Sequence, residues 1–522
     1  MTVPETVSRN PATGEIIGRT PVQGADDVVR AVESARQAQK GWAALDFRER
    51  RNHVTRVRDF ITAHADSIAK TISRENGKTR MDALTTEVIP AAMAADYYGR
   101  TARHALRRRR LSPGSILFMN KRSYIDRVPF GVVGIISPWN YPFSIPFHEI
   151  IMGLMAGNGV ILKMATQAQE VGKALEECMA AGGFPEGLFA QLHLPGERAG
   201  DAFINAGIDK LFFTGSVEVG KTLMGKAAAR LLPVSLELGG NDPMIVCNDA
   251  NLLRAVGGAL WAGFSNAGQS CGGVERIYVE KGVYEDFVRL LRARVEQLTY
   301  GDGSDPSVQV GAMTTAKQVR TVTEHVDDAL EKGGVITATA QRFVGSAKGQ
   351  FFPPMVIERV NETMVTMQRE TFGPVVAVQC VADLDEAVTR ANDSFLGLTA
   401  SVWTRNRRKA HRIAARLEAG TVSVNDHLMS HGLAETPWGG FKQSGIGRTH
   451  GCLGLEEMTQ PRVVVDDILP AVQKNMWWYP HSKKVYDGLL GVLPLLYGRG
   501  IAQRLRGGAR VLGTFARTFQ KD

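Results

Sequence analysis

Residues 131–163, GVVGIISPWNYPFSIPFHEIIMGLMAGNGVILK, contain the pattern that most clearly predicts the fold class. It opens with a run of apolar residues from 132 to 136, which is typical of a strand buried on both faces. A helical pattern follows as far as Met155 and ends in the glycine-containing residues 156–159. Residues 160–162 form a second apolar strand. This order predicts two parallel strands joined by a crossover helix.

The same alternation continues beyond this stretch. Helices are expected over 168–181 and 217–230, and strands near 191–194 and 211–213. After Gly240 the alternation of strands and helices begins again. The chain is therefore expected to be an α/β protein, with a parallel, doubly wound sheet followed by a second α/β unit.

The residues before this stretch follow a different pattern. A helix is expected from Asp26 to Gln39, and a longer helical region fills about 47–108. Residues 115–119 and 123–128 have the pattern of two strands around a polar turn, which predicts a hairpin.

The composition is that of a globular protein without a membrane span. The 522 residues are 44% hydrophobic and 22% charged, and a chain of this length can form two or three domains with sizeable cores. Five scattered cysteines indicate a reducing compartment rather than a disulfide framework. The N-terminus has no apolar signal region, and no run of about 18 apolar residues occurs. We therefore expect a cytoplasmic protein.

The net charge of +9 is concentrated in a few places. Residues 483–522 contain eight basic and two acidic residues, and a second basic cluster is Arg107–Arg110. Neither cluster is accompanied by zinc-finger spacing or by an RNA-binding aromatic motif. We therefore expect no nucleic acid partner and no metal, and we interpret the arginine cluster as a solvated surface.

Two short motifs carry the chemistry. The run NAGQSCG places Cys271 between Gly268 and Gly272, so we expect an open backbone that a substrate can approach closely. The run LELGGNDP places Glu237 in an apolar strand that ends in two glycines. A carboxylate is costly in such a strand unless it has a function. A thiol and a base, both beside glycines, predict covalent catalysis.

These two motifs, together with four others, resemble those of the NAD(P)-dependent aldehyde dehydrogenase superfamily. The other four occur in the family's order, and the resemblance covers about residues 8–465: PWNYP (138–142), FTGSVEVG (213–220), ETFGP (370–374) and PWGGFK (437–442). The resemblance implies an aldehyde dehydrogenase-like fold. Its parts are a Rossmann-type cofactor domain, a second α/β catalytic domain and a small β oligomerisation arm.

The resemblance also implies the domain boundaries. The NAD(P)-binding domain would comprise 1–110 and 130–239, and the catalytic domain 240–443. The arm would join 111–129 to 456–468. Residues 471–522 would then be a basic, amphipathic C-terminal extension.

A dinucleotide site, for NAD or NADP, is implied near the carboxyl ends of the strands of the first sheet. Glu370 and Phe372 would lie at the nicotinamide ribose and ring. Family members commonly have a glutamate where this chain has Thr166, and a neutral threonine does not repel a 2′-phosphate. The choice between NAD and NADP therefore stays open. The full set of implied cofactor residues is Trp139, Lys163, Thr166, Gly215, Ser216, Gly220, Glu370 and Phe372.

The reaction implied by the resemblance is oxidation to the free acid. Cys271 attacks the aldehyde carbon, and the Asn140 amide and the Cys271 N–H stabilise the oxyanion. After hydride transfer to the nicotinamide, Glu237 deprotonates the water that cleaves the thioester. Relatives that transfer the acyl group to coenzyme A typically lack this base, so we expect a non-acylating enzyme. A structural or binding protein on the same scaffold is the non-enzyme alternative, and it would be expected to lose Cys271 or Glu237.

The sequence leaves the aldehyde open between two classes. Enzymes for succinate semialdehyde typically hold the distal carboxylate with two arginines, and the corresponding residues here are His148 and Ser265. The candidate pocket residues Tyr141, Ile145 and Phe264 favour an apolar aldehyde, medium or long in chain or aromatic, although all three suit a core equally well. Succinate semialdehyde, or another small polar semialdehyde, stays the alternative.

Residues 471–522 exceed what the implied fold needs. The run MWWYP is followed by aliphatic residues 489–497 and then by arginines interleaved with aliphatic residues. Aromatic side chains beside cations are typical of peripheral contact with an anionic membrane. Packing on the body or on a neighbouring subunit is equally expected, and disorder is a third alternative. The resemblance implies a homodimer or homotetramer that acts on a small-molecule aldehyde.

Overall fold

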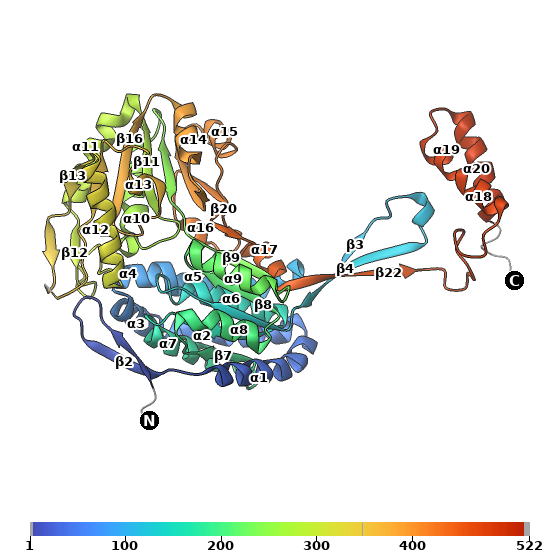
Figure 1. Ribbon diagram of the computed structural model, residues 1–522, viewed down its shortest axis with the longest axis horizontal. Helices are drawn as coiled ribbons and strands as arrows, with labels where there is room; N and C mark the ends of the chain where they lie inside the picture. Colours follow the sequence, from blue (N-terminus) through green and yellow to red (C-terminus); the bar gives the residue numbers. More distant parts are fainter. Residues whose placement is uncertain (1–3, 347, 516–522) are drawn as a thin grey trace. The chain divides into compact units, whose positions relative to one another are not determined.

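The structure, a computed structural model, describes residues 4–346 and 348–515 (Figure 1). The predicted domains and C-terminal extension also include residues 1–3, 347 and 516–522, which lie outside the described part. The chain divides into two compact units. Unit 1 comprises Met1–Arg107 and Arg127–Gln460, and unit 2 comprises Arg108–Asp126 and Pro461–Asp522.

Unit 1 contains the predicted strand–helix–strand element. The strands β5 (Val132–Ile136) and β6 (Gly159–Lys163) are parallel neighbours, and α6 (Ser144–Ala156) connects them. The helix ends at Gly157, whose φ of 95° suits a residue without a Cβ. The prediction for this stretch is confirmed.

These strands belong to a six-stranded sheet of order β21-β9-β8-β5-β6-β7. Val133 and Ile135 of β5 face one hydrophobic core, whereas Val132 and Ile136 face another. Helices therefore cover both faces, as in a doubly wound sheet. Its other strands are β7 (Phe189–Leu192), β8 (Lys210–Thr214), β9 (Val234–Glu237) and β21 (Gly445–Ile446). The helices around it are α1 (Ala25–Ala44), α2 (Phe47–Ala63), α3 (Ala65–Asn76), α4 (Arg80–Ala83), the π-helix η1 (Leu84–Val88), α5 (Ile89–Ala105), α7 (Gln169–Ala181), α8 (Gly196–Ala206), α9 (Val217–Ala228) and α17 (Gly451–Glu457).

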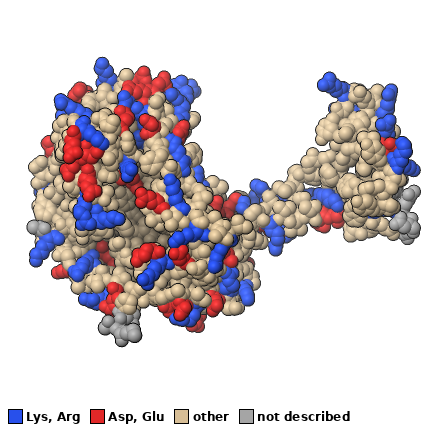
Figure 2. All heavy atoms as spheres, in the orientation of Figure 1, with Lys and Arg blue, Asp and Glu red and all other residues tan. Residues whose placement is uncertain are grey.

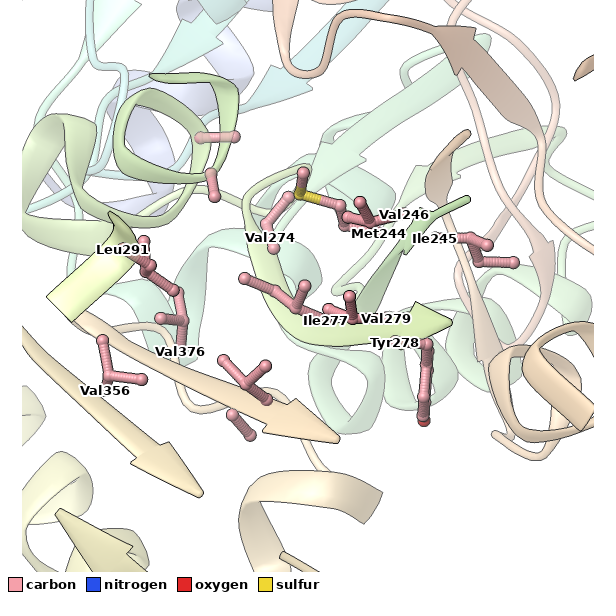
Figure 3. Close-up of a cluster of buried hydrophobic side chains, with 14 of the residues drawn as sticks. Met244, Ile245, Val246, Val274, Ile277, Tyr278, Val279, Leu291, Val356 and Val376 are labelled. Carbon is pink, nitrogen blue, oxygen red and sulfur yellow. The ribbon is translucent and has the colours of Figure 1, made fainter. Parts of the chain in front are cut away.

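A second sheet, of order β13-β15-β16-β11-β10-β18-β19, is the α/β unit predicted after Gly240. It is parallel except for β13, which is antiparallel to β15. Figure 3 shows its core, where residues of β10 (Asp242–Val246) and β11 (Val274–Glu280) lie beside Val356, Val376 and Leu291. The other strands are β13 (Val335–Thr339), β15 (Met355–Glu358), β16 (Val375–Val381), β18 (Thr399–Trp403) and β19 (Thr421–Val424). Its helices include α10 (Leu252–Phe264), α11 (Tyr284–Glu296), α12 (Ala316–Glu331), α14 (Leu384–Asn392) and α15 (Arg407–Ala414).

The predicted hairpin is wrong in one of its two strands. The strand β4 (Lys121–Pro129) is present, but its hairpin partner is β3 (Arg109–Leu111) rather than residues 115–119. Residues 116–118 instead form a 3-10 turn. The preceding Ser-Pro-Gly-Ser sequence interrupts the strand, because proline cannot donate to a ladder and glycine weakens it.

A third strand and three helices complete unit 2. The strand β22 (Thr459–Asp467) gives a three-stranded sheet of order β22-β4-β3. The helices α18 (Lys483–Leu490), α19 (Val492–Tyr497) and α20 (Ile501–Phe515) pack on one another. A Cβ at Gly488 of α18 would lie only 1.6 Å from the Thr514 hydroxyl of α20. Over the residues that the structure describes, no helix is both long enough and apolar enough to span a bilayer.

Candidate active site

The loop that carries Cys271 lies between a 3-10 turn (Ser265–Gly268) and β11. Residues 266–268 have φ angles of 54°, 54° and 69°, a left-handed conformation that is uncommon for residues other than glycine. The Asn266 side-chain amide holds the loop by donating to the carbonyl oxygens of Asn140 (2.8 Å) and Gln269 (3.1 Å). Cys271 itself is half-buried.

The glycines beside Cys271 have a packing role that the sequence did not predict. A Cβ at Gly268 would lie 2.0 Å from the Gly373 carbonyl oxygen, and a Cβ at Gly272 would lie 2.7 Å from the Trp438 ring. Both glycines therefore allow the loop to pack tightly against neighbouring segments. Gly272 also lines a cavity that borders Cys271. The expectation that the two glycines leave the backbone open to a substrate stays a prediction.

Asn140 follows β5 and reaches the Cys271 loop, because its side-chain amide donates to the Gln269 carbonyl oxygen at 3.2 Å. Its own carbonyl oxygen accepts from the Lys78 ammonium at 2.9 Å, and Lys78 pairs with Glu87 at 2.6 Å. Glu87 also accepts from the Phe143 N–H at 2.7 Å. Both ionic side chains are fully buried, and such a pair is favourable only with additional hydrogen bonds of this kind.

Lys78 and Glu87 are neighbours of Asn140 that no sequence motif predicted. They lie in the helical region 47–108, far from every motif. The only signal in the sequence is a pair of opposite charges in a region with many apolar positions. That signal is weak, because charged residues on a helix usually face solvent.

Glu237, the last residue of β9, has a buried carboxyl group. Neither of its oxygens has a hydrogen-bond partner among the described residues. Burial raises the pKa of this carboxyl well above its usual value, the charge of Glu149 raises it further, and Arg448 opposes the shift. An unpaired ionised carboxyl at this depth is costly, so burial favours the protonated form of Glu237, and only its ionised form can accept a proton.

The Cys271 thiol is also affected by its surroundings. Burial raises its pKa, and the nearby carboxyls of Glu370, Asp242 and Glu237 add to the effect. The resting side chain is therefore a neutral thiol. A base must accept its proton when it acts as a nucleophile.

Glu370 and Phe372 lie on one loop whose backbone is held by hydrogen bonds to Glu275. The Glu370 carboxylate accepts from the Gly240 N–H at 3.1 Å, and a Cβ at Gly239 would lie 2.3 Å from it. Phe372 has a φ of 54°, and its ring meets that of Trp139 edge-on, with 5.6 Å between centroids. The buried Glu275 carboxylate accepts from the N–H groups of this loop at 2.8 to 2.9 Å. These contacts fix both side chains.

A polar cavity of about 440 Å³ collects most of the predicted site. Polar side chains that the sequence analysis did not name, such as Gln167 and Lys317, also line it. Lys163, Thr166 and Gly220 do not. The predicted residues that line it are Trp139, Asn140, Gly215, Ser216, Glu237, Cys271, Glu370 and Phe372.

Lys163 and Thr166 lie at and just after the end of β6. The Lys163 ammonium is buried and makes no hydrogen bond or ion pair within residues 4–346 and 348–515. Burial lowers its pKa to about 8, against the opposing charge of Glu197. Thr166 is half-buried, and its hydroxyl donates to Gln167 at 3.1 Å. Gly220 instead packs in α9, where a Cβ would lie 2.6 Å from Leu238.

A second, apolar cavity of about 120 Å³ also borders Cys271. Of the three candidate pocket residues, Tyr141 lines it, whereas Ile145 and Phe264 are buried elsewhere. Its mouth includes Met93 and Met429, which are about half exposed. No lysine, arginine or acidic residue is among the described residues that line it. The others are Thr85, Thr86, Ile89, Pro90, Trp261, Ser270, Gly272, Leu428, His431, Gly432, Leu433 and Trp438.

His148 and Ser265 lie outside this cavity. The His148 ring is fully buried and lies 4.0 Å, centroid to centroid, from His450. The Ser265 hydroxyl donates to Asp82 at 2.9 Å. His431, which does line the cavity, has its pKa lowered to about 4 by burial. The apolar cavity therefore carries no positive charge at neutral pH.

Comparison with known proteins gives consistent findings. The model of the aldehyde dehydrogenase family matches residues 3–464. The chain is 35% identical over 507 residues to 4,4'-diapolycopene aldehyde oxidase of Methylomonas sp, covering 97% of this chain and 94% of that protein. It is 39% identical over 455 residues to a Mycobacterium bovis protein named putative succinate-semialdehyde dehydrogenase (NADP(+)) 2, covering 87% and 86%. The structure of an aldehyde dehydrogenase from Bacillus cereus in complex with NAD+ matches with a TM-score of 0.84 at 31% identity, covering 89% and 94%.

Proposed function

The chain belongs to the aldehyde dehydrogenase family, and on this premise we propose that it oxidises an apolar aldehyde to the free carboxylic acid. It is an NAD(P)-dependent aldehyde dehydrogenase. The proposal for the aldehyde rests on one observation: Cys271 borders both a polar cavity and an apolar cavity without charged lining residues. A medium- or long-chain aldehyde, or an aromatic one, suits such a lining because most of the side chains around the cavity are apolar and none is charged.

We propose Cys271 as the nucleophile and Glu237 as the base. The neutral thiol needs a proton acceptor, and the two unpaired oxygens of Glu237 border the same cavity. The thiolate adds to the aldehyde carbon, and the Asn140 amide and the Cys271 N–H stabilise the oxyanion. When bound, NAD(P)+ supplies the hydride acceptor. Loss of the hydride from the tetrahedral adduct leaves a Cys271 thioester. Glu237 passes the thiol proton to solvent and, ionised again, deprotonates the water that attacks this thioester. The acid is released, and the leaving Cys271 thiolate takes the proton back from Glu237.

The polar cavity has the chemistry that a dinucleotide needs. Gly215 and Ser216 line it where α9 begins, and a helix amino end favours phosphate. Glu370, held by Gly240, offers a carboxylate to ribose hydroxyls. The unpaired Lys163 ammonium and the neutral Thr166 fit a 2′-phosphate, so we propose that NADP is accepted as well as NAD.

The relatives point to two substrate classes. The protein named 4,4'-diapolycopene aldehyde oxidase matches 97% of the chain, more than residues 1–470 alone can supply, so the match extends into the C-terminal extension. This favours an extended apolar aldehyde. The relatives named for succinate semialdehyde favour the alternative. The uncharged lining weighs against it, because a buried carboxylate needs a cationic partner.

We also propose the finer organisation. Residues 1–110 and 130–239 form the NAD(P)-binding domain and residues 240–443 the catalytic domain. Residues 111–129 and 456–468 form an arm that assembles a homodimer or homotetramer, since β22 is an exposed edge strand. The protein is cytoplasmic, with peripheral membrane contact through residues 471–522.

The test is turnover of a panel of aldehydes by the purified chain with NAD+ and with NADP+, followed by nicotinamide absorbance. The panel contains straight-chain aldehydes of increasing length, an aromatic aldehyde and succinate semialdehyde. We expect kcat/KM to rise with chain length and the product to be the free acid without coenzyme A. A preference for succinate semialdehyde would replace the proposed substrate class.

A further inference from the structure

The positive charge of this protein lies in unit 2. Unit 2 (Arg108–Asp126 and Pro461–Asp522) contains 15 lysines and arginines and five acidic residues, a net charge of +10. The whole chain carries +9, so unit 1 carries −1. Figure 2 shows that the charged side chains of unit 1 are of both signs and interspersed. A net charge this concentrated indicates an anionic partner for unit 2.

The same unit exposes large apolar side chains. At the 3-10 turn, Ile116 and Met119 are 66% and 63% exposed. Their neighbour Phe118 packs edge-on against Trp477, with 5.6 Å between ring centroids. Next to Trp477, the Tyr479 side chain is 82% exposed. The contact between Phe118 and Trp477 therefore places apolar residues around 116–119 beside apolar residues around 477–479.

The helix α20 has two apolar faces. One face packs inside the helical cluster, where Val511 and Thr514 are buried. The other face carries Ile501, Leu505 and Leu512, which are 79%, 68% and 70% exposed. These three residues are four and seven positions apart, so they share one side of the helix. Exposed arginines of the same helix, Arg506 and Arg510 among them, lie on other sides.

We propose that unit 2 docks on an anionic lipid surface. The exposed aliphatic and aromatic side chains would enter the boundary between headgroups and acyl chains, and the lysines and arginines would contact the headgroups. On the α20 face that carries Ile501, Leu505 and Leu512, a second copy of the chain is a poorer occupant, because two surfaces of like charge repel. The edge proposed for assembly lies on another element, β22. The docking surface extends the peripheral contact proposed for residues 471–522 to the 3-10 turn of residues 116–118, and it does not depend on which aldehyde is oxidised.

The test is flotation of the full chain with vesicles of phosphatidylcholine, with and without phosphatidylglycerol, at low and at high salt. We expect binding only to the anionic vesicles and weaker binding at high salt. The variant I501S/L505S/L512S should bind at least tenfold more weakly. The variant R499Q/R506Q/R510Q should bind roughly a hundredfold more weakly, and its loss should be smaller at high salt. The control L231S/L253S changes two exposed leucines of unit 1, 90% and 71% exposed, and should bind like the unmodified chain.

Three measurements distinguish lipid docking from self-association and from a loss of folding. Equal binding to vesicles with and without phosphatidylglycerol would overturn the proposed docking. So would variants that change the oligomeric mass by light scattering but leave vesicle binding unchanged, since a second copy would then cover the surface. Turnover of a short, soluble aldehyde is recorded for every variant. Turnover like that of the unmodified chain shows that a binding loss is not a folding loss, and it tests the proposed catalytic function independently.

Discussion

At the scale of single residues, the environment sets the chemistry of the site. A thiol and a carboxyl group are ordinary side chains, but burial raises the pKa of both Cys271 and Glu237. Burial disfavours the ionised form, and nearby carboxylates disfavour it further. The lysine at the end of β6 shifts in the opposite direction for the same reason, because its charged form is the protonated one.

Replacement of Cys271 by alanine should lower aldehyde oxidation by roughly four orders of magnitude or more, because no other nucleophile among the described residues borders both cavities. Binding of NADP+, measured by fluorescence titration, should be unchanged. Cys380→Ala is the control, since Cys380 is exposed and lines neither cavity. Retained turnover in the Cys271 variant would remove the proposed nucleophile.

Replacement of Glu237 by glutamine should slow steady-state turnover by roughly a hundredfold or more, because the amide cannot accept a proton from water. Stopped-flow absorbance should show whether a burst of reduced cofactor precedes slow turnover. A burst indicates that Glu237 serves deacylation. If the burst is lost as well, Glu237 is also needed to deprotonate Cys271.

The pH profile of turnover should have a rising limb, since Glu237 acts as a base only when it is ionised. The midpoint of this limb should lie well above the usual pKa of a carboxyl group. Burial raises the pKa of Glu149 to about 8, so Glu149 is negatively charged only above that pH. Glu149→Gln should therefore move the part of this limb above pH 8 to lower pH, because it removes a negative charge that opposes ionisation of Glu237. Glu176→Gln is the control: Glu176 is also shifted by burial, but it is not among the groups that shift Glu237. A limb at the same pH in all three proteins would show that Glu149 does not affect the base.

The affinity for NADP+ relative to NAD+ should fall between pH 7 and pH 9. The Lys163 ammonium has a pKa of about 8, so it is charged at the lower pH and largely neutral at the higher. Binding of a 2′-phosphate then requires uptake of a proton, which costs up to about tenfold in affinity. Lys163→Met should remove this pH dependence. Isothermal titration with both cofactors measures the ratio of the two affinities at each pH.

Thr166→Glu should shift the preference towards NAD+, and the same titration measures this change in the ratio of affinities.

At the scale of elements, glycines set how closely segments approach. The helix α9 contains Gly220 and Gly225, which meet different surroundings. A Cβ at Gly220 would lie 2.6 Å from Leu238, just after β9, whereas a Cβ at Gly225 would meet nothing within 4 Å. The position of the first turn of α9, beside the polar cavity, therefore depends on Gly220.

The same substitution at these two positions should have opposite effects. Gly220→Ala should destabilise the protein by roughly 1–3 kcal/mol, because it overpacks the contact with Leu238. Gly225→Ala should stabilise it by about 1 kcal/mol, because alanine is the better helix former at an open site. Thermal unfolding measures both. Two effects of the same sign would mean that the Leu238 side chain moves aside without cost.

In the whole molecule, the cavities beside Cys271 and the net positive charge belong to different units of the chain. Both cavities that border Cys271 are lined by unit 1, which is nearly neutral, and the net positive charge lies in unit 2. The strand β22 is an edge of the three-stranded sheet, and Val463 and Val465 on one of its faces are 59% and 61% exposed. Such an edge can pair with a further strand.

The variant V463K/V465K should lower the oligomeric mass measured by light scattering, because charges on an edge strand oppose pairing with a second copy. Val335→Lys is the control, since it places a lysine on β13, at the edge of the seven-stranded sheet. An unchanged mass in the β22 variant would show that assembly does not use this edge.

The α/β class, the order of the elements and the motifs around Asn140, Glu237 and Cys271 could be predicted from the sequence. These features are local, because an apolar run of five residues or a helical period can be recognised from the neighbouring residues in the sequence alone. The strand that pairs with β4 could not be predicted from such a local pattern. Residues 115–119 have the composition of a strand, and only the tertiary structure places residues 109–111 beside β4.

Which buried residues face a cavity depended on the tertiary structure. The helix α6 is buried at all of its residues, so its sequence has no polar face that would show which of them face a cavity. Tyr141, which precedes α6, lines the apolar cavity, whereas Ile145 in α6 does not. The Lys78–Glu87 pair beneath Asn140 and the tight packing of Gly268 and Gly272 were decided in the same way. Each depends on contacts between segments far apart in the chain, and a local pattern carries no information about such contacts.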